Sequence, residues 1–312
     1  MTYERLGQLY SVYETVTSRD YVPNLGYLLR LPLDKRTRAV TRVIGILLTK
    51  IQSDPGVGTV LSSVFDGGLE LADVMFETLS HDVDLLESAY LAACEAAHGT
   101  DDSGSFLSRL LDLDATFVER WASWLQRQDW INRHEDSRDH SFLWRRDDYK
   151  PTLLRIIEVI SARPEDSFSF SFDAEVFFRL RGSESGQAII RQRQDEFLDE
   201  LIKDRYSDQG FMVFLFQIIS GFPAERRRSR IATFLHYNPD FEAFRRLSLE
   251  PSSWGWEGSA VPTLKKRVDF FESLRPLFKP VNLLGHRQLV EQRIQSLRRQ
   301  IEREKREDFI GF

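Results

Sequence analysis

Residues 208–249 read DQGFMVFLFQIISGFPAERRRSRIATFLHYNPDFEAFRRLSL, and this stretch decides the fold class. The spacing of its apolar residues predicts three helices separated by two tight turns. The first helix is almost entirely apolar, the second has arginines on one side and residues such as Phe234 on the other, and the third follows Asp240. No such helix pair can bury its apolar face alone, so it must pack on neighbours of the same kind, as in helical-repeat proteins.

Amphipathic helices and short breaks continue along the rest of the chain. The segments 106–125 and 234–249 both begin with Phe-Leu, pass a turn containing Asp and continue into a helix headed by Phe. They start 128 residues apart, or about three units of ~43 residues, a length typical of HEAT and armadillo repeats. Chance similarity between amphipathic helices is the alternative explanation. We predict an all-α, solenoid-like stack of helix pairs, HEAT- or TPR-like, closed by a long C-terminal helix.

The pattern predicts four parts. Residues 1–129 form an N-terminal helical array, and the polar stretch 130–148 is a long loop or a boundary. Residues 149–249 form a second helical array. Residues 250–312 hold a tryptophan-containing loop and the C-terminal capping helices, whose narrow apolar seam is Val290, Ile294, Leu297 and Ile301.

Composition describes a folded soluble chain. Hydrophobic residues make up 42% of the 312 residues and charged residues 29%, which is ordinary for a globular protein. A single cysteine, Cys94, excludes an internal disulfide framework and favours a reducing cytoplasm. The opening MTYERLGQLY does not resemble a signal peptide, and the longest apolar run is too short to cross a bilayer. We therefore expect a cytoplasmic protein without membrane contact.

Charge is distributed unevenly. Residues 1–222 contain 24 Lys and Arg against 36 Asp and Glu, whereas residues 223–312 contain 18 against 12. Basic and aromatic residues of this C-terminal part are the candidates for binding a partner: Arg226, Arg227, Arg228, Arg230, Arg245, Arg246, Trp254, Trp256, Lys265, Lys266 and Arg267. Arg and Trp dominate protein–protein hot spots, so we expect a protein partner or self-association. Phosphate contacts and base stacking by the same residues make nucleic acid the alternative, and a solvated surface without a partner is the third reading.

The sequence contains no convincing catalytic motif. No GxxxxGK[ST] phosphate loop is present, so we expect a non-enzymatic chain without a cofactor. One cluster has the composition of a metal site: His134, Glu135, Asp136, Asp139 and His140. Imidazole and carboxylate together suit Zn²⁺ or Mn²⁺, which makes a metal-dependent enzyme a further alternative. Arg133 and Arg138 lie inside the cluster and oppose a cation, and this favours a solvated polar loop instead.

The C-terminal region resembles a known kind of protein. The runs DFEAFRRLSLEPSSWGWEGSAVPTLKKRVDFFESLRPLF and GHRQLVEQRIQSLRRQIEREKREDF, within residues 240–309, are similar to the C-terminal helical-repeat region of large bacterial multidomain NTPases linked to phage defence. Those chains often close with a Trp-Gly-Ser loop, and here Glu257 separates Trp256 from Gly258 and Ser259. The resemblance implies a recognition or scaffold region of a bacterial defence assembly, although the nucleotide-binding module is missing from this sequence.

Overall fold

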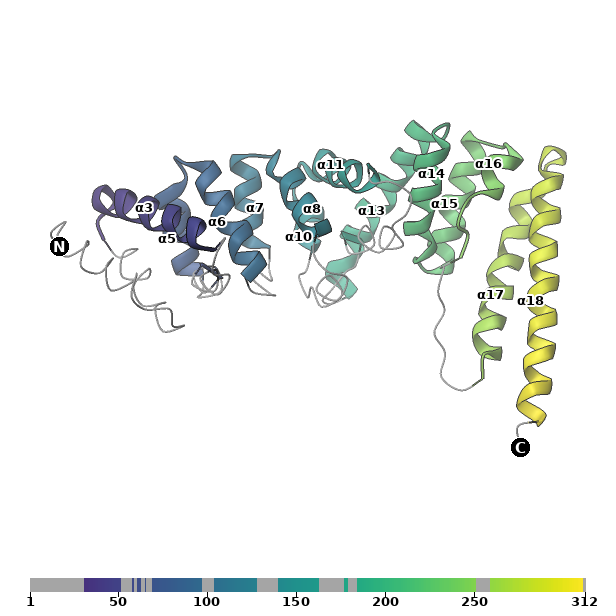
Figure 1. Ribbon diagram of the computed structural model, residues 1–312. Coiled ribbons are helices and arrows are strands. Elements are labelled where there is room, and N and C mark those ends of the chain that lie inside the picture. Colours follow the sequence, from purple (N-terminus) through teal and green to yellow (C-terminus); the bar gives the residue numbers. More distant parts are fainter. Residues whose placement is uncertain are drawn as a thin grey trace. The chain divides into compact units, whose positions relative to one another are not determined.

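The computed structural model describes residues 31–51, 58, 61–62, 65, 69–96, 104–127, 140–162, 177–178, 184–250 and 259–310. Within these ranges the chain forms thirteen α-helices and no strand (Figure 1), which confirms the predicted all-α fold. The chain divides into two compact units. Among the described residues, unit 1 ends at residue 178 and unit 2 begins at Glu184.

Unit 1 consists of seven described helices that pack on near neighbours in the chain. Helix α3 packs on α5 and α6, α7 packs on α6 and α8, and α11 packs on α8 and α10. The helices are α3 (Leu33–Ile51), α5 (Leu69–Leu79), α6 (Val83–Ala96), α7 (Ser105–Leu113), α8 (Phe117–Arg127), α10 (Ser141–Arg145) and α11 (Tyr149–Ser161). Val40, Ile44 and Leu47, which the 3.6-residue period places on one face of α3, are completely buried.

Part of the predicted 130–148 loop or boundary is helical. Residues 141–145 form α10, and Trp144 from this helix is completely buried, with its indole Nε1 donating to the Phe177 carbonyl at 2.7 Å. The turn that begins α7 approaches α10 closely: Gly104 has φ +65°, and a Cβ there would lie 2.1 Å from the Phe142 ring. Only glycine satisfies both conditions. Residues 130–139 of the polar stretch lie outside the described ranges.

A buried acidic group lies between α6 and α8. The Glu87 side chain is almost fully buried and accepts a hydrogen bond from Arg120, which also pairs with Asp114 at 3.1 Å and with Asp84 at 3.7 Å. Burial raises the pKa of Glu87 to about 7, and the negative charges of Asp114 and Asp84 add to this rise, while Arg120 opposes it. The folded chain therefore binds this proton more tightly than the unfolded chain does.

We expect the Glu87→Gln variant to be more stable than the wild type above pH 7 and nearly equal to it at pH 5. Because the pKa of Glu87 is raised on folding, the free energy of unfolding falls as pH rises from about 4.5 to about 7, where the ionised carboxylate must stay buried. The stability difference between variant and wild type should grow by roughly 2 kcal/mol across that window. Urea unfolding at both ends of the window measures it, and a difference independent of pH would contradict the assignment.

Unit 2 contains the stretch 208–249 and forms the predicted succession of helices. Its elements are α13 (Glu184–Arg205), α14 (Gln209–Ser220), α15 (Ala224–Tyr237), α16 (Phe241–Arg245), α17 (Val261–Leu274), η3 (Arg275–Phe278), η4 (Val281–Leu283) and α18 (Leu284–Ile310). Asp208 and Asp240 begin α14 and α16, and their carboxylates accept from the backbone N–H of Phe211 at 3.0 Å and of Ala243 at 2.7 Å. These side-chain caps explain why helices begin there.

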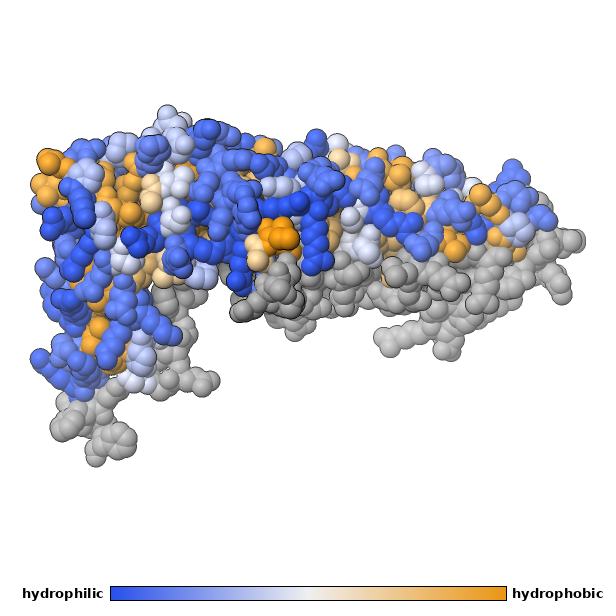
Figure 2. Space-filling model, turned by 180° about the vertical axis from the view of Figure 1, so that it is seen from behind, coloured by the Kyte–Doolittle hydropathy of each residue, from blue (hydrophilic) through white to orange (hydrophobic). Residues whose placement is uncertain are grey.

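Helices α17 and α18 form an extended antiparallel pair, which we call the α17–α18 hairpin (Figure 1). The predicted seam residues Val290, Ile294, Leu297 and Ile301 are all buried against α17. On α17, Leu264, Val268, Phe271 and Leu274 form the matching buried face. Figure 2 shows that much of the remaining surface of this hairpin is hydrophilic. A narrow apolar seam thus joins two otherwise polar helices.

Candidate binding site

The four arginines of the RRRSR segment on α15 point to different surroundings. Arg226 donates to the Asp195 carboxylate from Nε at 2.9 Å and from Nη2 at 2.8 Å. Arg230 pairs with Asp195 at 2.8 Å and with Asp199 at 2.8 Å. Because both carboxylates belong to α13, these two arginines hold α13 and α15 together and are committed to the interior of unit 2.

Arg227 is buried toward α17. Its side chain is only 7% exposed, its Nη1 donates to the Leu249 carbonyl at 3.2 Å, and its guanidinium carbon lies 3.9 Å from the centre of the Phe270 ring. Arg227 forms no ion pair with any described residue. Burial lowers the pKa of Arg227, and the charge of Glu250 opposes that shift. The result is a cation held in an apolar setting with little compensating negative charge nearby.

Glu250 forms ion pairs with two arginines and also acts electrostatically on Arg227. Its side chain is only 10% exposed, and it pairs with Arg267 of α17 and with Arg293 of α18, the latter at 2.9 Å. Arg267 was a predicted binding residue, and the structure shows it paired inside unit 2. One carboxylate thus serves two guanidinium groups and lies near a third.

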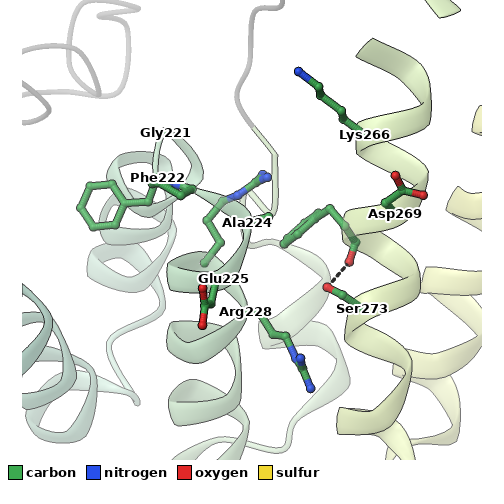
Figure 3. A pocket seen from close by; sticks show the side chains of 11 residues that line it. Gly221, Phe222, Ala224, Glu225, Arg228, Lys266, Asp269 and Ser273 are labelled. Carbon is green, nitrogen blue, oxygen red and sulfur yellow. Dashed lines mark hydrogen bonds between the residues drawn. The ribbon is translucent and has the colours of Figure 1, made fainter. Parts of the chain in front are cut away.

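A pocket of about 770 Å³ opens between the beginning of α15 and the face of α17. Arg227, Arg228 and Lys266 contribute positive charge to it, and Glu225 and Asp269 contribute negative charge. Figure 3 shows Glu225 and Arg228 on α15 and Lys266, Asp269 and Ser273 on α17, along the two walls. The full lining comprises Gly221, Phe222, Pro223, Ala224, Glu225, Arg227, Arg228, Lys266, Asp269, Phe270 and Ser273. We call this the α15–α17 pocket.

Three predicted residues, two adjacent ones on α15 and one on α17, line this pocket. Arg228 and Lys266 are exposed and form no ion pair with a described residue, and Arg227 is a buried member of the same lining. Lys265, beside Lys266 on α17, is also exposed and without an ion pair in the described ranges. The pocket therefore brings together three cations of α15 and α17 that have no ion pair among the described residues, beside the two carboxylates Glu225 and Asp269.

The remaining predicted residues lie elsewhere or outside the described ranges. Arg245 pairs with Glu242 of its own helix at 2.7 Å, and Arg246, the residue that follows this short helix, is exposed. Trp254 and Trp256 lie outside the described residues, so stacking by them stays a prediction.

Of the predicted metal ligands only His140 falls in a described range. It is buried in unit 1, with its ring 5.5 Å from that of Trp121 and 5.2 Å from that of Phe177. The other four predicted ligands, His134, Glu135, Asp136 and Asp139, lie outside the described residues. No group of three or more metal-ligating side chains occurs within the described ranges, and the predicted metal site stays a prediction.

Sequence reasoning missed a second basic surface, on α18. Arg299, Arg303 and Arg306 are exposed and make no ion pair with a described residue. Their spacing of four and three residues places them on one face of the helix, on the side opposite the apolar seam. That same spacing was available in the sequence SLRRQIEREKRE and could have identified them. We call these three residues the α18 arginine ridge.

Neither a membrane-spanning helix among the described residues nor a similar known protein was found. None of the described helices has the combination of length and apolarity that crossing a membrane requires. Comparison with protein-family models, with curated proteins and with solved structures gives no match to the chain.

Proposed function

We propose that the chain is a non-enzymatic recognition module whose unit 2 binds an acidic surface of a protein partner at the α15–α17 pocket. One observation carries this proposal: the exposed cations Arg228 and Lys266 flank the buried Arg227, and none of the three has an ion pair among the described residues. Neighbouring arginines such as Arg226 and Arg230 are neutralised internally. Unpaired cations around a pocket attract and orient a complementary anionic surface.

The mixture of charges supports a protein over a nucleic acid at this pocket. Glu225 and Asp269 line the same walls as the cations, and neither forms an ion pair with a described residue. A nucleic-acid backbone presents a repeating negative charge, which these carboxylates repel. A protein surface offers isolated carboxylates together with cations and apolar groups, and can match all three features.

The packing of the helices supports a scaffold role. In both units, helices pack on helices one or two places further along the chain, as in α13–α14–α15 and α6–α7–α8. This local pattern is typical of a solenoid-like stack of helical repeats, which presents an extended surface to partners. The resemblance of residues 240–309 to helical-repeat regions of bacterial defence NTPases extends the proposal to a place in a larger cytoplasmic assembly.

We expect reversal of the pocket charges to remove the partner. The full chain, isolated gently from cells that express it naturally, should carry a stoichiometric protein partner by native mass spectrometry. The triple variant Arg228→Glu, Lys265→Glu, Lys266→Glu should lose it, because each cation becomes a repulsive carboxylate at an acidic interface. The matched control, Arg299→Glu, Arg303→Glu, Arg306→Glu, changes the net charge equally on α18 and should retain it. Equal retention by both variants would contradict the proposal.

The α18 arginine ridge favours a second candidate function, binding of nucleic acid. Three guanidinium groups that have no ion pair with a described residue lie along one face of a helix and suit successive phosphates, and among the residues that line this surface Glu302 is the carboxylate. Glu302 is itself paired with Lys305 at 2.7 Å. Under this function the roles of the two triple variants reverse: co-isolated nucleic acid is lost from the α18 variant and kept by the pocket variant. Its binding should also weaken steeply with salt.

A further inference from the structure

We infer that the α15–α17 pocket binds a carboxylate of an extended acidic peptide segment, with the buried guanidinium of Arg227 as the anchor. This inference rests on the proposed function and specifies the chemistry by which the partner is held. A glutamate or aspartate side chain of the partner would enter between α15 and α17, toward Arg227. Arg228 and Lys266 would face the same carboxylate or its neighbours from the two walls.

The state of Arg227 is the main reason. Arg230, which is buried to a similar extent, has two carboxylates, whereas Arg227 has a carbonyl oxygen at 3.2 Å and an aromatic face. Its Nε has no hydrogen-bond partner among the described residues. Glu250 lies close enough to influence Arg227 but is already shared between Arg267 and Arg293. A buried cation left in this condition costs free energy, and an incoming carboxylate would offset that cost.

The beginning of α15 adds to the attraction. Pro223 precedes the helix and provides no side-chain cap, and Pro223 and Ala224 both line the pocket. The first backbone N–H groups of α15 therefore lack a side-chain partner, and the positive end of the helix dipole points toward this region. A carboxylate near Arg227 would meet these N–H groups in addition to the cations.

The size and remaining walls of the pocket indicate a peptide instead of a single ion. A volume of about 770 Å³ is in the usual range for pockets that bind organic ligands. Phe270 supplies apolar wall, which suits the methylene groups of a peptide side chain. Glu225 and Asp269 would repel the closely spaced charges of a polyphosphate more strongly than carboxylates two residues apart along a peptide, so the pocket favours the peptide.

The test is a direct binding measurement with a matched pair of probes. A fluorescein-labelled octapeptide of alternating glutamate and alanine is titrated with the full chain at low salt, and fluorescence anisotropy gives the Kd. The second probe replaces every glutamate by glutamine. We expect the glutamate peptide to bind at least about tenfold more tightly, since charge-assisted hydrogen bonds supply the difference.

Variants locate the binding. Lys266→Gln and Arg228→Gln, both at exposed positions without ion pairs, should each weaken binding of the glutamate peptide about two- to fivefold. Arg227→Met should weaken it about tenfold or more, provided its circular dichroism melting curve shows a folded chain. Arg299→Gln, in the α18 arginine ridge, is the control and should leave the Kd unchanged.

Three results would overturn the inference. These are equal binding of the glutamine peptide, a Kd unaffected by Lys266→Gln and Arg228→Gln, and tighter binding of a thymidine dodecanucleotide that depends on the same two residues. If the glutamate octapeptide does not bind while the pocket triple variant still loses the protein partner, the inference is wrong and the proposed function stands. If the octapeptide binds as expected but the triple variant retains the protein partner, the proposed function is wrong.

Discussion

The Glu250→Ala variant is expected to be less stable than the wild type by about 3 kcal/mol or more. Glu250 is the shared carboxylate of Arg267 on α17 and Arg293 on α18, and its charge also acts on Arg227 of α15. Its removal takes the Glu250 carboxylate away from Arg267, whose side chain is only 14% exposed. Breaking a buried pair from one side costs far more than the pair itself contributes, because the remaining charge stays desolvated.

An exposed ion pair in the same unit provides the control. Glu242 pairs with Arg245 three residues further along α16, and both side chains are more than half exposed. The Glu242→Ala variant should therefore change the stability by no more than about 0.5 kcal/mol. Urea unfolding of the two variants and the wild type measures both effects. If the two alanine variants lose equal stability, Glu250 does not have the central role assigned to it here.

Shortening one side chain of the α17–α18 seam is the second change with a large expected effect. Leu297 is completely buried at the middle of the seam, between Ile294 and Ile301. The Leu297→Ala variant should lose about 2 to 5 kcal/mol, the sum of lost burial and the cavity that remains. Because α18 is mostly polar outside this seam, few other apolar contacts can compensate.

The measurement is thermal unfolding followed by circular dichroism, with Gln295→Ala on the exposed side of α18 as the control. The control is expected to stay within about 0.5 kcal/mol of the wild type. A Leu297→Ala variant as stable as the wild type would mean that α18 does not depend on α17. Amide hydrogen exchange gives a second measure. The account predicts faster exchange in α18 of the Leu297→Ala variant than in the wild type, and equal exchange would contradict it.

Local pattern was sufficient to predict the helices and their buried faces. The apolar positions of α18 at 290, 294, 297 and 301 are buried as predicted. Such faces follow from a period of 3.6 residues, which any single helix displays in its own sequence. The stretch 140–148 was harder to interpret, because its polar residues concealed Trp144, whose burial depends on contacts with distant parts of unit 1.

The arginines of α15 show what the sequence could not supply. They were treated as one basic face, yet Arg226 and Arg230 turn toward α13, Arg227 toward α17, and Arg228 toward solvent. The separation depends on the register between α13 and α15, which aligns Asp195 and Asp199 with arginines more than thirty residues away. Asp195 and Asp199 are four residues apart, and so are Arg226 and Arg230. This matching spacing predicts ion pairs only when the two helices are known to be neighbours.

The central claim is that a protein partner binds at the α15–α17 pocket. Hydrogen–deuterium exchange on the isolated complex, compared with the chain alone, tests it most directly. We predict slower exchange in the first turn of α15 and in the first half of α17 when the partner is bound, with α3 and α5 of unit 1 unchanged. Protection confined to unit 1, with α15 and α17 exchanging as in the free chain, would contradict the account.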